Sequence, residues 1–210
     1  LWYETAGKGG KYYDPRPSGK KSLQGRIQEM APRVTAIYDL MKESEGVDVT
    51  FTEEQYDQHT EDFQTMMTEL TGMDVSNASM YDGATALAEA LLMATRANSV
   101  NSEGRVLVPK ALHPFYAEVV NSCTHAQGIR QAVIGYDAKT GKTDLEALKN
   151  YEGTKPTAVV IAQPNFFGVL EDVDAITDWA HAQGALVVAV VNPPSLALLK
   201  PPSQWGAKGA

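Results

Sequence analysis

A glycine-containing turn stands directly before an alanine-rich run in the segment NASMYDGATALAEA, residues 77–90. Gly83, Ala84 and Thr85 would open the helix that this run predicts. Their backbone N–H groups, the threonine hydroxyl and the positive end of the helix dipole could together hold a phosphate group. Asp82, however, is a good N-cap for the same helix without any ligand. The spacing leaves both interpretations open, a phosphate cradle or a plain helix cap, and favours the cap.

Two further polar side chains are expected where strands end. His113 follows a predicted strand at 105–109, where an imidazole could stack on a flat cofactor ring or move protons. A surface histidine before a proline-started helix is the commoner case. Asn192 ends a predicted strand at 185–191 and carries no charge, so it cannot stabilise a protonated ring nitrogen as an aspartate would. Both positions are possible ligand contacts, and neither is decisive by itself.

Other distinctive residues favour ordinary structural roles. The aromatic pair in PNFFG, 164–168, could wall a pocket or anchor a subunit contact, although packing is favoured. The segment NPPSLALLKPPSQWG is too proline-rich for regular structure and too apolar for water, which indicates an interface or pocket loop. We expect Cys123 to be a core thiol, because no cation near it in sequence would activate it. His59, His125 and His181 lack metal-ligand spacing and should face solvent, so no metal site is predicted.

The elements that would position these residues alternate along the chain. A helix is expected at about 53–70 with Gly72 as its C-cap. Further helices are expected at about 83–95, 114–125, 143–151 and 172–183, and strands at 105–109, 131–136, 157–163 and 185–191. TDLE, 143–146, looks like a capping box in which Thr143 caps the third helix of that series. Unbroken apolar strands between amphipathic helices indicate an α/β fold, a mostly parallel sheet flanked by helices, with ligands at the carboxyl ends of the strands.

Composition narrows the class of protein. The 210 residues carry a net charge of −8, which repels nucleic-acid backbones and anionic membrane surfaces, so neither is an expected partner. The longest apolar stretch, ALVVAVV, is far shorter than the roughly 20 residues that span a bilayer. A single cysteine and the absence of a signal pattern favour a reducing compartment. We expect a cytoplasmic protein of a bacterium or archaeon, with a mitochondrial location as the alternative.

The run FQTMMTELTGMDVSNASMYDGATALAEALLMATR, 63–96, closely resembles the amino-terminal subunit or half of the glycine cleavage system P-protein. HPFYAEVV, TDLEALK, QPNFFGVLEDV and NPPSLALLKPPSQWGA match the same family in the same order, so the resemblance covers roughly 63–207. It implies a fold type I, aspartate-aminotransferase-like large domain, incomplete here, over 51–210. Residues 1–50 form an unassigned amino-terminal arm and helix without a match. FTEEQYDQHTEDFQ, 51–64, and the final WGAKGA depart from the family pattern.

The resemblance also implies a function. The chain would be a component of glycine dehydrogenase (aminomethyl-transferring), which uses pyridoxal phosphate to decarboxylate glycine and passes the aminomethyl group to lipoylated H-protein. Lys200 and Lys208 are poor substitutes for the lysine that holds the cofactor, and that lysine should follow beyond GAKGA. In the family it belongs to the homologous partner subunit, so this chain would be inactive alone.

The cofactor-site positions would then be degenerate ones. They are Gly83, Ala84, Thr85, His113 and Asn192. The first three would act as a helix start near a subunit contact. Two rivals remain: a stand-alone pyridoxal-phosphate lyase or transaminase whose lysine lies in missing downstream sequence, and a non-catalytic scaffold subunit.

Overall fold

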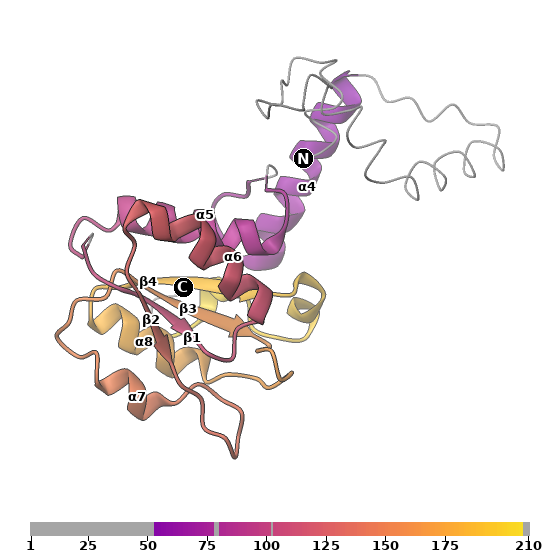
Figure 1. The fold of residues 1–210 in the computed structure, drawn as a ribbon. Coiled ribbons are helices and arrows are strands. Elements are labelled where there is room, and N and C mark those ends of the chain that lie inside the picture. The colour runs from indigo at the N-terminus through magenta and orange to yellow at the C-terminus, as the bar shows by residue number, and fades with distance from the viewer. Residues whose placement is uncertain (1–52, 78–79, 102, 208–210) are drawn as a thin grey trace. The chain divides into compact units, whose positions relative to one another are not determined.

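The computed structural model describes residues 53–77, 80–101 and 103–207 (Figure 1). They belong to two compact units, which are described separately. One includes α4 (Glu53–Thr71) as far as Met66 together with 75–77 and 80–81, and the other comprises the rest. The predicted arm at 1–50 lies outside the described residues. The second unit contains all the candidate site positions, and the sheet belongs to it.

Helix α4 has nearly the predicted bounds. It ends at Gly72, whose positive φ of 69° and N–H bond to the Thr68 carbonyl at 2.7 Å make the expected glycine C-cap. The apolar side chains expected on one face of this helix are Phe63, Met66, Met67 and Leu70. Met67 is half-buried and the other three are exposed. The helix prediction is confirmed, but its apolar face is mostly exposed.

The sheet consists of four parallel strands in the order β2-β1-β3-β4. Their bounds are β1 (Val106–Pro109), β2 (Gln131–Ile134), β3 (Ala158–Gln163) and β4 (Leu186–Val191). Val106 pairs with Gln131 of β2 and with Ala158 of β3, so the four carboxyl ends lie at one edge of the sheet. The predicted parallel α/β sheet is therefore confirmed.

Helices cover both faces of this sheet (Figure 1). On one face lie α5 (Gly83–Ala97) and α6 (Pro114–Thr124), and on the other α7 (Leu145–Lys149) and α8 (Val173–Ala182). Because side chains alternate along a strand, Val106 and Val108 pack beneath α5 and α6, whereas Leu107 packs on the α7 and α8 side. Two separate apolar layers result. None of the helices that the structure describes is long and apolar enough to cross a bilayer.

Strand β4 forms one edge of the sheet and is only partly covered. β3 is buried along its whole length, whereas every residue of β4 is exposed or half-buried. A groove of about 800 Å³ runs beside β4 and is lined largely by apolar side chains of β4 and α5. An uncovered edge strand presents backbone groups that can pair with a further strand.

A buried side-chain amide joins the end of α5 to the sheet. The Asn98 side chain donates to the carbonyls of Thr157 and Gly184, at 2.9 Å each, and its oxygen accepts from the N–H groups of Val100 and Asn101. The turn after α5 is thereby tied to the beginnings of β3 and β4.

The expected capping box at TDLE is wrong. The N-cap of α7 is Asp144, whose carboxylate accepts from the Glu146 N–H at 2.9 Å. Thr143 is unavailable because its N–H and hydroxyl both donate to the buried carboxylate of Glu171, at 2.8 and 3.0 Å. A contact across 28 residues has displaced the local cap.

Candidate functional site

The start of α5 is a reciprocal cap. Asp82 has an extended backbone, and one of its carboxylate oxygens accepts both the Thr85 N–H at 2.7 Å and the Thr85 hydroxyl at 2.8 Å. The Thr85 oxygen in turn accepts the Asp82 N–H at 3.3 Å. The Thr85 N–H, and next its hydroxyl, hold the pKa of the Asp82 carboxyl below its usual value. Asp82 is the expected N-cap, and it engages both groups through which Thr85 could hold a phosphate.

Gly83 lies against the hydroxyl of Tyr116 in α6. A Cβ added to Gly83 would overlap that oxygen and would lie 3.1 Å from Cζ of the same ring. Only glycine lets helix α5 begin so close to Tyr116. Tyr116 was not among the expected site residues, although it follows the N-cap His113 by three residues and so lies on the same side of the start of α6.

His113 is exposed and caps α6 through its imidazole, because Nδ1 accepts the Phe115 N–H at 3.2 Å. An accepting Nδ1 leaves the proton of a neutral imidazole on Nε2. The imidazole ring is 5.7 Å from the Tyr116 ring and 5.2 Å from Phe166, which meets it edge-on at 90°. Tyr116 thus connects His113 to Gly83, so the structure brings together two of the positions singled out in the sequence.

The PNFFG aromatics extend this cluster along the carboxyl edge of the sheet. Phe167 packs against Tyr136, with ring centroids 4.9 Å apart, and it also touches Phe166. Both phenylalanines remain about half exposed, at 50% and 47%. The favoured expectation of packing is met only in part, because these rings line the surface as well as contacting their neighbours.

Asn192 stands apart from the aromatic cluster. It is exposed at the end of β4, and its carbonyl accepts the N–H and the hydroxyl of Ser195 at 2.8 and 2.7 Å. Its side chain does not cap the following 3₁₀ helix η2 (Pro193–Ala197). Among the described residues, no hydrogen bond or ring contact joins Asn192 to α5 or to His113.

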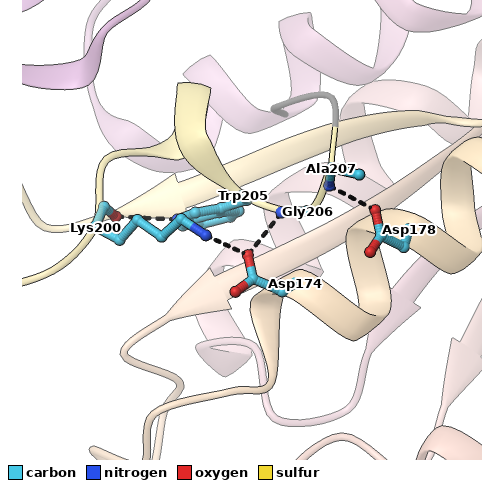
Figure 2. A network of polar contacts seen from close by, with 6 residues as sticks. All are labelled: Asp174, Asp178, Lys200, Trp205, Gly206 and Ala207. Atoms are coloured by element: carbon cyan, nitrogen blue, oxygen red, sulfur yellow. Dashed lines mark hydrogen bonds and ion pairs between the residues drawn. The ribbon is translucent and has the colours of Figure 1, made fainter.

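The proline-rich loop folds onto α8 (Figure 2). After η3 (Pro202–Gln204), the Trp205 side chain is fully buried and its Nε1 donates to the Lys200 carbonyl at 3.0 Å. Asp174 accepts both the Lys200 ammonium at 2.7 Å and the Gly206 N–H at 2.6 Å. Lys200 first, and Gly206 next, hold the pKa of Asp174 below its usual value. The expectation that this apolar loop is covered holds for Trp205, which is buried, but not for Leu198, which is 94% exposed.

One of the expectations for His125, His181 and Cys123 is confirmed and two are wrong. His125 is exposed, as expected. His181 is half-buried instead and lines the groove beside β4, with Nδ1 buried and unpaired among the described residues. Cys123 is exposed and not a core thiol, because α6 turns Val120 and Thr124 inward. The His59 side chain and Lys208 lie outside the part of the chain that the structure describes. No group of three or more potential metal ligands occurs in the described part of the chain.

A family model described as glycine cleavage system P-protein matches residues 58–210. The chain belongs to this P-protein family. Two bacterial proteins, each named probable glycine dehydrogenase (decarboxylating) subunit 1, resemble it over 149 residues: one from Thioalkalivibrio sulfidiphilus at 59% identity and one from Alcanivorax borkumensis at 58%. Each match covers 71% of this chain and 33% of the relative. The chain therefore spans about a third of the length of the P-proteins it matches, and the resemblance seen in the sequence is confirmed.

Solved structures agree on the fold. The crystal structure of a glycine decarboxylase (P-protein) of the glycine cleavage system in inhibitor-bound form is 42% identical, with a TM-score of 0.63, over 71% of this chain and 32% of that one. A sphingosine-1-phosphate lyase from Burkholderia pseudomallei, 17% identical, has a TM-score of 0.56 over 94% of this chain and 53% of its own. The second likeness concerns the fold alone. The expected class, part of a fold type I large domain, is confirmed.

At the positions expected to bear on the cofactor, the side chains of this P-protein family member do not fit pyridoxal phosphate. The N–H and hydroxyl of Thr85 are taken by Asp82, whose negative charge would oppose a phosphate. Lys200 is held by Asp174. Asn192 offers no charge to a ring nitrogen.

Proposed function

We propose that this chain is a component of glycine dehydrogenase (aminomethyl-transferring), subunit 1, in the cytoplasm of a bacterium. Membership of the P-protein family over residues 58–210 is the observation that carries the proposal. The bacterial relatives that bear the subunit 1 name support it. In this role the chain would support decarboxylation of glycine and transfer of the aminomethyl group to lipoylated H-protein.

The cofactor would belong to a homologous partner subunit. We propose that the partner binds pyridoxal phosphate through its own lysine, and that this chain completes the assembly and is inactive alone. The engaged Thr85, the ion-paired Lys200 and the uncharged Asn192 support this division of roles. Gly83, Ala84, Thr85, His113 and Asn192 are then degenerate cofactor-site positions, with the α5 start near the subunit contact.

The test is reconstitution. The purified chain should show no absorbance of a lysine-bound cofactor after incubation with pyridoxal phosphate and should not exchange the glycine carboxyl with bicarbonate. Adding the homologous subunit should produce exchange above that of the partner alone. A borohydride-trapped adduct at Lys200 or Lys208 would show an independent cofactor site and contradict the proposal.

A scaffold role is the second candidate, because Asp82 already satisfies the helix start without a ligand. His113→Ala and His125→Ala separate the two in the reconstituted assembly, since these histidines lie at opposite ends of α6 and both are exposed. If the aromatic cluster serves the reaction, only His113→Ala lowers exchange. Binding of the wild-type chain without any rise in exchange would favour a scaffold.

A further inference from the structure

Two loops at the carboxyl edge of the sheet close around a buried carboxylate. Glu171 precedes α8, and its two oxygens accept the N–H and hydroxyl of Thr143 and the side-chain amide of Asn165, all at 2.8 to 3.0 Å. The Glu171 N–H donates to the buried side chain of Gln163 at 2.8 Å. Among the residues that the structure describes, no lysine or arginine pairs with Glu171. The carboxylate instead joins the loop after β2 to the loop after β3.

Asn165 links Glu171 to the backbone of the PNFFG turn. Its amide also donates to the Gly141 carbonyl at 2.8 Å, and its oxygen accepts the N–H groups of Phe167 and Val169 at 3.0 and 3.1 Å. The Asn165 side chain that makes these hydrogen bonds is itself buried. The hydrogen bonds of Asn165, which itself donates to Glu171, therefore fix the backbone conformation of the turn.

The PNFFG turn places the Phe166 ring in contact with His113. The Phe166 N–H donates to the Ala111 carbonyl at 2.8 Å, which joins the turn to the segment after β1. Because the Phe166 ring is half exposed, burial of its own surface orients it only weakly. Fixed hydrogen bonds in the turn below are the stronger constraint on its edge-on contact with His113.

We propose that Glu171 is a positioning residue for the candidate site: through Asn165 it fixes the turn that holds Phe166 against His113. Burying a carboxylate costs free energy unless it is hydrogen-bonded, and an apolar side chain at position 171 would leave the donors of Thr143 and Asn165 without this acceptor. The two oxygens of the Glu171 carboxylate can accept all three donors, the N–H and hydroxyl of Thr143 and the amide of Asn165, at one place. A part in glycine decarboxylation rests on the proposed function, whereas the effect on His113 does not.

Histidine-ring NMR spectra of the whole chain test this positioning. Glu171→Gln keeps the size of the side chain but turns an NH₂ group toward at least one of the donors. We expect its His113 ring signals to move in the direction produced by Phe166→Ala, which removes the neighbouring ring, while the His125 signals stay in place. Asp178→Asn is the matched control, because Asp178 also accepts a backbone N–H, from Ala207 at 2.8 Å, but on the α8 side (Figure 2).

If Glu171→Gln does not fold, a less disruptive variant can be used for the same measurement. Thr143→Val removes one hydroxyl donor and keeps the backbone bond to Glu171, so it should move the His113 signals less and in the same direction. Unchanged His113 signals in the folded Glu171 or Thr143 variant, with a clear change in Phe166→Ala, would overturn the proposal. So would an equal change in Asp178→Asn.

The reconstituted assembly then tests the catalytic consequence. We expect Glu171→Gln to lower kcat for glycine–bicarbonate exchange more than it raises KM, since it disturbs the site without removing a binding group. A moved His113 signal with unchanged exchange would overturn the part in the reaction and leave the positioning intact. Absence of exchange in the wild-type assembly would instead count against the proposed function, because the NMR result does not depend on it.

Discussion

The Tyr116 hydroxyl lies so close to Gly83 that these two residues fix how α6 approaches the start of α5. Because each is on a different helix, the contact also places His113, at the beginning of α6, beside the α5 N-terminus. The glycine of the GAT segment is thereby explained by a packing contact, without reference to a ligand.

Gly83→Ala should destabilise the chain by about 1–3 kcal/mol, because a methyl group must displace the Tyr116 ring. Adding Tyr116→Phe should restore part of the loss, since it removes the overlapping oxygen but leaves Cζ 3.1 Å away. Urea unfolding measures both. Gly135→Ala is the matched control, because nothing lies within 4 Å of a Cβ there. Equal losses at the two glycines would show that the Tyr116 contact is unimportant.

Asp82→Ala should cost about 1 kcal/mol at neutral pH, the usual effect of losing an N-cap. The folded state lowers the pKa of this carboxyl, so its contribution is present above the unfolded pKa and is lost as pH falls through the folded pKa. The difference between wild type and Asp82→Ala should therefore shrink in acid. Asp82→Asn caps without titrating, and its stability difference from Asp82→Ala should vary less with pH. Unfolding curves across the acid range give the comparison.

Trp205→Ala should be far more damaging than loss of the ion pair beside it. Trp205 is fully buried in the α8-side layer, so its removal should cost about 3–5 kcal/mol. The Lys200 and Asp174 side chains are 42% and 51% exposed, and Lys200→Met should cost less than about 1 kcal/mol. Thermal or urea unfolding separates the two. A large loss in Lys200→Met would mean that the ion pair, and not the indole, holds the loop on α8.

Asn98→Ala should destabilise the domain by about 3 kcal/mol or more, since leaving each buried partner unpaired costs about 1–3 kcal/mol. Amide hydrogen exchange should rise at the beginnings of β3 and β4, which Asn98 joins. Asn150→Ala is the control, because Asn150 is an exposed residue after α7, and its effect should stay within about 0.5 kcal/mol. Similar losses for the two variants would contradict this role of Asn98.

Much of the fold could be predicted because its determinants are local. Runs such as TAVVIAQ and ALVVAVV are apolar on both sides, which is typical of strands in a covered parallel sheet, and β3 and β4 have nearly the predicted bounds. β3 is buried as this pattern predicts, whereas β4, at the edge of the sheet, is only partly covered. Gly72, Gly128 and Gly184 follow helical segments with positive φ. The Asp82 cap likewise needs only four neighbouring residues. Order along the chain and the preference for parallel pairing then lead to the α/β class.

The arrangement of the candidate site depends on partners that are distant in sequence. Thr143 would cap α7 by its local pattern, yet Glu171 binds it from 28 residues away. His113 meets Phe166, and Gly83 meets Tyr116, only because the strands between them place their loops at one sheet edge. Hydrophobic periodicity and capping energies act over a few residues and can be inferred from a linear pattern. Which side chains converge follows from long-range packing, since the same local pattern is compatible with many different neighbours.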